Sequence, residues 1–197
     1  MVSTTLTVGA GRPRDPRIDE AVVAAVVELL CEVGYQRLSI AAVAARAGTT
    51  KPAVYRRWPT KAQLVHEAVF PAEGRPLVPE TDDLAADLRS MLTDGIALFS
   101  RPEVRAAAPG LLADLAQDPG AHPRLLARFT SPMFDQLQGR LERAAAAHQV
   151  RPDVDARLLV DVIGGSTFMA VLTRDRAELE GPWVDQTLAL LLAGVQA

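Results

Sequence analysis

The sequence has 197 residues and a formal net charge of −3, enough chain for one large core or for a small domain joined to a larger one. Hydrophobic residues make up 49% of the chain and charged residues 23%, as in an ordinary soluble globular protein. The sequence contains no continuous apolar run of about 18 residues, so no membrane span is predicted. The charge is uneven: residues 12–70 hold nine basic and six acidic side chains, whereas residues 71–197 hold twelve and eighteen, so the acidic total does not exclude DNA binding by the first part.

Residues 1–14 are expected to form a flexible basic arm. The first eleven residues lack the basic start and apolar stretch of a secretory signal, and we therefore expect a cytoplasmic protein. The Gly-Arg-Pro-Arg segment that follows is an extended cationic element whose Arg12 and Arg14 suit the narrow minor groove of DNA. The alternative is an ordinary solvated charged leader.

A first helix is predicted to begin at Asp15-Pro16, with the aspartate as its cap and the proline in its first turn. Gly34 is expected to end this helix. Cys31 lies within its apolar pattern, so we expect a buried structural thiol in a reducing compartment, and a single cysteine excludes an internal disulfide. Apolar residues recur at helical spacing at Ile18, Val22, Val26, Leu29 and Val33.

Residues 39–61 predict two short helices joined by a glycine turn, followed by the start of a third. Ser39 is the expected cap of the first helix, Gly48 makes the turn, and either Thr49 or Thr50 caps the second. Pro52 stands in the first turn of that second helix, where its missing N–H costs nothing. Val54 and Trp58 are expected to face the core, with the outside formed by Lys51, Tyr55, Arg56 and Arg57. A compact apolar wedge that carries a basic, aromatic helix is typical of a helix-turn-helix in the DNA major groove.

Thr60 and Gln63 form a capping box that predicts a helix running to about Val69. Three prolines and one glycine then interrupt the helical pattern from Pro71 to Pro79, and the pattern resumes after Thr81. We therefore expect a helix-turn-helix domain over residues 15–70 and a larger C-terminal domain over residues 82–197.

Every later segment has a helical pattern, and no strand-type alternation or internal repeat occurs. A break is expected at Pro109-Gly110 and a kink or break beside Pro132. The predicted helices cover residues 82–100, 102–117 in two pieces, 121–149, 153–174 and 182–195. The fold class is therefore all-α, with about nine helices in two unequal domains.

The stretch from Ser39 to Leu64 resembles the DNA-binding domain of the TetR family of bacterial repressors, and the resemblance covers about residues 15–70. The resemblance implies a homodimer that binds a pseudo-palindromic DNA operator as a repressor and leaves it when a small molecule enters the larger domain. The residues that carry the match are Gly34-Tyr35, Ser39-Ile40, Val43-Ala44, Ala47-Gly48, Val54-Tyr55, Trp58 and Lys61.

The resemblance also implies which side chains contact DNA. Lys61 would hold a phosphate at the start of its helix. Independently of the family, Arg56 or Lys51 could contact O6 and N7 of a guanine, a pair worth roughly 1–3 kcal/mol of discrimination. The family match places further residues at the groove and its phosphates: Ser39, Thr49, Thr50, Lys51, Ala53 and Tyr55.

The C-terminal domain holds an apolar candidate pocket for a partly apolar effector, formed by Met and Phe side chains at helical spacing. The alternative is that the same residues form plain core. The residues are Met91, Ile96, Phe99, Phe129, Met133, Phe134, Phe168 and Met169.

The last two long helices are the predicted dimer surface, because they are more apolar than helices that face water. Gly164-Gly165 either permits close approach of another helix or marks a local bend. The predicted interface residues are Leu159, Ile163, Gly164, Trp183, Leu188 and Leu191.

No enzyme, metal site or cofactor is expected. The three histidines, His66, His122 and His148, are far apart, and no nucleophile elbow or phosphate-binding loop occurs. The competing interpretation is an all-α small-molecule binding protein or enzyme in which the helix-turn-helix is only a packing motif.

Overall fold

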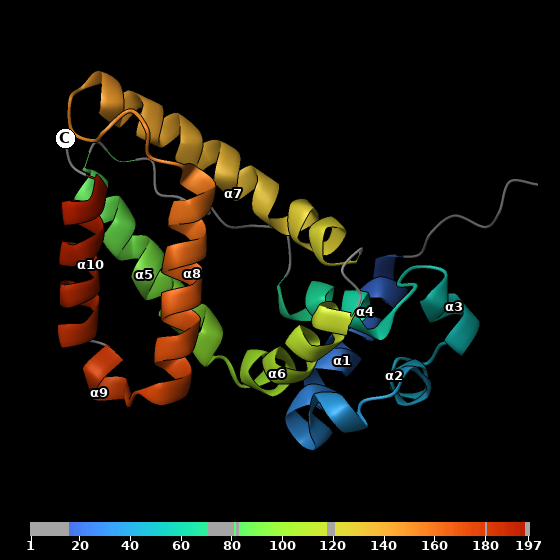
Figure 1. The fold of residues 1–197 in the computed structure, drawn as a ribbon. Coiled ribbons are helices and arrows are strands. Elements are labelled where there is room, and N and C mark those ends of the chain that lie inside the picture. The colour runs from blue at the N-terminus through green and yellow to red at the C-terminus, as the bar shows by residue number, and fades with distance from the viewer. Residues whose placement is uncertain (1–15, 71–80, 82, 118–120, 180, 196–197) are drawn as a thin grey trace, which may run out of the picture.

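The computed structural model describes residues 16–70, 81, 83–117, 121–179 and 181–195, with the backbone alone for residues 115 and 121–133. The described part is helical and contains no strand, which confirms the predicted all-α class (Figure 1). Four helices form the N-terminal module: α1 (Pro16–Arg37), α2 (Ile40–Arg46), α3 (Lys51–Tyr55) and α4 (Lys61–Val69). The others are α5 (Leu84–Ser100), α6 (Pro102–Gln117), α7 (Ala121–Ala146), α8 (Ala156–Thr173), α9 (Arg176–Leu179) and α10 (Pro182–Val195).

Side-chain caps begin the three short helices where the sequence predicts them. The Ser39 hydroxyl accepts a hydrogen bond from the Ala42 amide at 3.2 Å, and the Thr60 hydroxyl accepts one from the Gln63 amide at 3.1 Å. Thr50, not Thr49, caps α3. Each cap satisfies a backbone donor that has no partner within its own helix.

Two glycines adopt a backbone conformation that L side chains rarely take. Gly48 has φ +63° and makes the turn between α2 and α3. Gly34 has φ +73° and kinks α1, which was predicted to end there but continues for one more turn to Arg37. A side chain at either position would strain the backbone, since only glycine enters this region without cost.

The N-terminal core includes a helix from beyond the predicted domain boundary. Helices α1 to α4 bury one face each, and α6 packs against α1 and α4 to close the same cluster. Figure 1 shows α6 between the N-terminal helices and the rest of the molecule. The predicted boundary segment, residues 71–80, lies outside the described residues. The buried residues that α6 contributes are Val104, Ala107 and Leu111.

Pro109 and Gly110 do not break α6, so the prediction of two pieces is wrong. The reason is packing against α1, because the Tyr35 ring lies directly on Gly110. A Cβ atom at Gly110 would stand 2.2 Å from Cδ1 of that ring. The Tyr35 hydroxyl also donates a hydrogen bond of 2.5 Å to the Asp114 carboxylate on α6. The Pro-Gly pair is therefore a docking position within a continuous helix.

A second core lies between α5, α7, α8 and α10, which form a helical bundle. Helix α7 continues past Pro132, so of the predicted kink or break beside this proline, the break does not occur. Among the described residues, α8 is long and apolar enough to cross a membrane by length and composition, with a third of its span buried in the protein. Core helices of soluble proteins have the same length and composition.

Candidate nucleic-acid interface and ligand cavity

Helices α2 and α3 present a polar, basic surface over an apolar base. Val54 and Trp58 are buried in the N-terminal core, as predicted. Tyr55 is a large hydrophobic side chain that is nevertheless exposed. The exposed residues of the predicted DNA surface are Ser39, Thr50, Lys51, Tyr55 and Arg56, while Thr49 and Ala53 are half-buried beside them.

The cations around this surface differ in their partners. Lys51 and Arg56 are exposed and make no ion pair within the described part of the chain. Arg57 was expected on the outside, but this is wrong, because its guanidinium pairs with Asp19 of α1 and is largely covered. Arg46 pairs with Glu32 at 2.8 Å and Glu28 at 3.1 Å. Lys51 and Arg56 are therefore the cations that this surface leaves open to an anionic partner.

Lys61 points into the protein in this conformation. Its ammonium donates a hydrogen bond of 2.6 Å to the Tyr35 carbonyl and lies 4.1 Å from the centre of the Tyr35 ring. Burial lowers the pKa of Lys61, while the nearby Asp114 acts in the opposite direction. A phosphate contact by this side chain would compete with the Tyr35 carbonyl. Arg12 and Arg14, the other predicted DNA contacts, lie outside the described residues.

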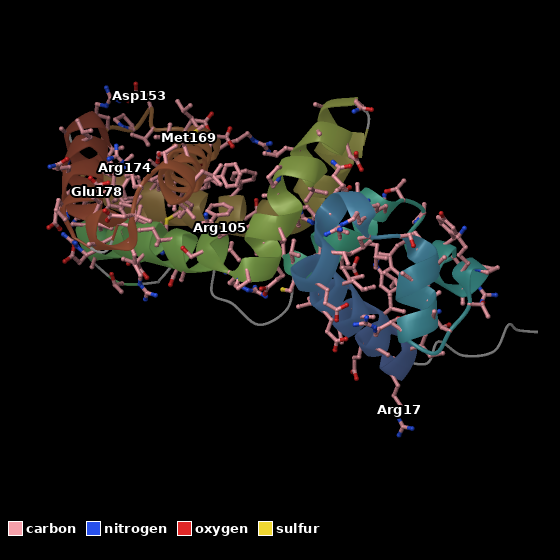
Figure 2. The ribbon with its side chains drawn as sticks, turned by 90° about the horizontal axis from the view of Figure 1, so that it is seen from below. Arg17, Arg105, Asp153, Met169, Arg174 and Glu178 are labelled. Carbon is pink, nitrogen blue, oxygen red and sulfur yellow. The ribbon has the colours of Figure 1, made fainter. Side chains whose placement is uncertain are left out.

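A cavity of about 580 Å³ opens where α5, α6, α8, α9 and α10 meet. This volume is in the range of small-molecule sites in proteins, roughly 300–1,000 Å³. Figure 2 shows Arg105 and Arg174, which line the cavity, in the half of the molecule opposite Arg17 of α1. The lining residues are Arg89, Thr93, Ile96, Ala97, Ser100, Arg105, Val171, Arg174, Arg176, Leu179, Gly181, Val184 and Asp185.

Of the predicted pocket residues whose side chains the structure describes, Ile96 alone lines this cavity. Met91 lies in the second core, and Phe134 packs against that core with the Arg157 guanidinium over its ring. Met169 is 57% exposed on α8 and does not line this cavity. Phe99 and Phe168 contact each other edge to face at 5.3 Å. The side chains of Phe129 and Met133 lie outside the described residues.

The arginines of the cavity were missed because no local pattern marks them. They come from four separate places in the chain: α5, α6, the residue after α8, and α9. Each one alone has the pattern of a solvated charge on a helix surface. The fold brings these arginines to one cavity. Only the packing of the helices shows that they line the same cavity.

The predicted dimer surface is also corrected, because four of its six residues are buried inside the protomer. Apolar residues run around most of α8, and hydrophobicity alone did not separate the inner face from the outer one. The buried residues are Leu159, Ile163, Leu188 and Leu191. Gly164 and Trp183 are half-buried. The large exposed apolar residues of these helices are instead Leu158, Val162, Met169 and Leu172 on α8 and Leu190 on α10.

Two features bear on other chemistry. Cys31 is exposed on α1, so the expectation of a buried thiol is wrong; its position lies outside the stripe that faces the N-terminal core. Among the described residues, no group of three or more His, Cys, Asp or Glu side chains is placed to hold a metal ion.

Comparison with known proteins finds two family profiles and several relatives. Residues 22–68 match a profile described as "Bacterial regulatory proteins, tetR family", and residues 78–191 match one described as "Tetracyclin repressor-like, C-terminal domain". The HTH-type transcriptional regulator YdeS of Bacillus subtilis is 28% identical over 189 residues, covering 95% of this chain and 94% of that protein.

Two further similarities extend over most of the chain. The DNA-binding transcriptional repressor TetR of Mycobacteroides abscessus is 29% identical over 181 residues, covering 89% of this chain and 90% of that protein. A crystal structure of a TetR family transcription regulator has a TM-score of 0.67 and 26% identity, covering 92% of this chain and all of the other.

Proposed function

Because this chain belongs to the TetR family of DNA-binding transcriptional regulators, we propose that it is a cytoplasmic, homodimeric repressor of a pseudo-palindromic operator. A small molecule bound in the C-terminal domain would release it from DNA. Regulators of this family bind DNA operators and act as dimers with small-molecule effectors. The observation that carries the proposal is the capped α2–turn–α3 unit, whose Lys51 and Arg56 are exposed above the buried Val54 and Trp58.

The proposed DNA contacts divide into two kinds. Arg56, exposed just beyond α3, would contact base edges in the major groove and set sequence preference. Thr50, Lys51, Tyr55 and Lys61 would contact phosphates and set position and affinity without reading sequence. Lys61 would have to exchange the Tyr35 carbonyl for a phosphate oxygen, a change that preserves one charged hydrogen bond.

Arg56→Ala is expected to change the sequence preference of the protein, with a loss of roughly 1–3 kcal/mol of discrimination at one base pair of each half-site. Lys61→Ala should instead weaken binding to every DNA by a similar factor and lower the slope of log affinity against log salt by about one. Gel shifts on the DNA upstream of the gene, and on single-base variants of it, measure both effects.

Arg143→Ala, an exposed change on α7 remote from the proposed DNA surface, is the matched control and should leave binding unaltered. Failure of the unsubstituted protein to shift any upstream fragment between low and physiological salt would overturn the repressor proposal. Identical behaviour of Arg56→Ala and Lys61→Ala would overturn the division of roles. The enzyme alternative has less support, because the relatives are named as transcriptional regulators.

The exposed apolar stripe of α8 is the proposed dimer surface. Leu158, Val162, Met169 and Leu172 recur at spacings of four, seven and three residues, so they share one face of the helix. Gly165 lies on the same face, and a Cβ atom there would meet no other atom of the protomer within 4 Å. A partner helix could therefore approach the backbone closely at this point. Leu190 of α10 extends the apolar surface.

Val162→Glu and Met169→Glu are each expected to raise the dimer dissociation constant at least ten-fold, as roughly 1.4 kcal/mol of lost association would do. In a two-fold dimer each substitution places two like charges in one apolar contact. Light scattering after size-exclusion chromatography measures the mass against concentration. Leu112→Glu on α6, where the leucine is 49% exposed against 45% for Val162, is the matched control and should not change the mass. Unaltered dimers in both α8 variants would exclude this surface.

A further inference from the structure

The cavity between α5, α6, α8, α9 and α10 is basic, although it lies in the acidic part of the chain. Residues 71–197 carry twelve basic side chains, and four of these twelve line the cavity. Asp185 is the one carboxylate among the lining residues. Such a concentration of arginine in a domain with excess acid is not expected of an ordinary solvated surface.

Two carboxylates that the structure describes at the cavity are each paired with one arginine. Asp185 is occupied by Arg89, with 2.7 Å between the two side chains. Glu178 stands 3.7 Å from the Arg174 guanidinium, a longer contact between exposed groups. Arg105 donates a hydrogen bond of 3.1 Å to the Val171 carbonyl, a neutral acceptor, so its charge has no anion in that contact. Among the described residues, the excess of positive charge at the cavity therefore comes from Arg105, whose hydrogen bond is to a neutral carbonyl.

The remaining wall is apolar. Ile96 and Ala97 of α5, Val171 of α8, Leu179 of α9 and Val184 of α10 line it together with the arginines. A ligand that satisfies both kinds of wall has an apolar body and an acidic head. Guanidinium groups bind carboxylate and phosphate oxygens through paired, charge-assisted hydrogen bonds.

We propose that this cavity binds a small apolar molecule with an oxyanion head, a carboxylate or a phosphate ester, held by Arg105 and Arg174. The effect of this ligand on DNA binding rests on the proposed function, whereas its binding in the cavity does not. Arg105 lies on α6, the helix that also buries Val104, Ala107 and Leu111 in the N-terminal core. An anion that draws Arg105 away from the Val171 carbonyl would act on that helix directly.

The test is fluorescence titration of the full chain with 8-anilinonaphthalene-1-sulfonate, an aromatic oxyanion small enough for the cavity. One saturable site per chain is expected. Arg105→Gln and Arg174→Gln should each weaken it about ten-fold or more, as expected for the loss of a charge-assisted hydrogen bond. Ala97→Trp, which fills the cavity without altering charge, should abolish it. Arg143→Gln, exposed on α7, is the matched control, and circular dichroism checks that each variant folds.

Competition then identifies the head group. At least one of the two anions, octanoate and octyl phosphate, should displace the dye. The neutral octan-1-ol and the cationic octylammonium should not displace it. The anion that displaces the dye at the lower concentration shows whether the site prefers a carboxylate or a phosphate ester. Equal dye binding by all variants would overturn the proposal, since the dye would then lie on another apolar surface such as the outside of α8. Displacement by octylammonium as readily as by the anions, or by neither anion, would overturn it as well.

The gel shift separates this proposal from the proposed function. In one outcome the arginine variants lose dye binding, but the unsubstituted protein does not shift upstream DNA. This result would support the cavity proposal and overturn the regulatory role. A normal gel shift together with dye binding that the arginine substitutions leave unchanged would support the regulatory role and overturn the cavity proposal.

Discussion

Replacing Arg140 by alanine is expected to lower the free energy of unfolding by about 3–5 kcal/mol, the usual result of breaking a buried ion pair from one side. Arg140 of α7 and Asp87 of α5 are both almost fully buried, and the guanidinium Nε donates to the carboxylate at 2.7 Å. Asp87 also accepts a hydrogen bond from the Thr81 hydroxyl at 2.5 Å. Without Arg140, the Asp87 carboxylate would remain in the core with its charge uncompensated.

Urea unfolding followed by circular dichroism measures the effect, with the slope checked for constancy. Arg143→Ala, one turn away on the exposed side of α7, is the control and should stay within about 0.5 kcal/mol of the original protein. Replacing both partners, Asp87→Leu with Arg140→Met, should cost much less than Arg140→Ala, because no buried charge is then left alone. A double variant as unstable as the single one would show that the pair contributes through its shape and not its charge.

Lowering the pH from 7.5 to 5 is expected to remove about 2 kcal/mol of stability through His66 alone. Burial lowers the pKa of His66 to about 4, from an ordinary value of 6.5. Between these two values the unfolded chain binds a proton that the folded protein does not, so stability falls as the pH falls through this window. The loss approaches roughly 3 kcal/mol below pH 4, where both states are protonated.

His66→Leu should remove this pH dependence, because leucine does not titrate; the Phe70 ring lies 5.0 Å from the imidazole. The measurement is the difference in unfolding free energy between pH 7.5 and pH 5 for both proteins. His148→Asn is the control: His148 is exposed and has φ 58°, a conformation that asparagine tolerates. A pH dependence that survives in His66→Leu would assign it to other groups.

The structure explains why stability and DNA binding should be linked in this chain. Tyr35, after the Gly34 break, contacts Gly110 and Asp114 of α6 and receives the Lys61 ammonium on its carbonyl. The sequence marks Gly34-Tyr35 and Lys61 as parts of the family match, and the structure places the Lys61 ammonium on the Tyr35 carbonyl. The contact of Tyr35 with Asp114 of α6, 79 residues later, is visible only in the folded chain.

Local features followed from the sequence because they depend on near neighbours. Caps at Ser39 and Thr60, the glycine turn at Gly48 and the burial of Trp58 are decided by residues within one or two turns of helix, and all were predicted. The break expected at Pro109-Gly110 was wrong for the opposite reason. Whether a proline ends a helix depends on the packing that supports it, and in α6 that support comes from Tyr35 of a distant helix.

The sequence by itself therefore determined an all-helical regulator with a helix-turn-helix near its N-terminus. Only the tertiary structure decided which side of α8 faces the core. Leu158 and Leu159 are equally apolar neighbours, yet about 100° of rotation around the helix leaves the first exposed and the second buried. It also decided that arginines from separate parts of the chain line a cavity, where Ile96 is the one predicted pocket residue found among the described side chains. Hydrophobic periodicity identifies the apolar residues of a helix, but the neighbouring helices determine which of them become core, surface or cavity wall.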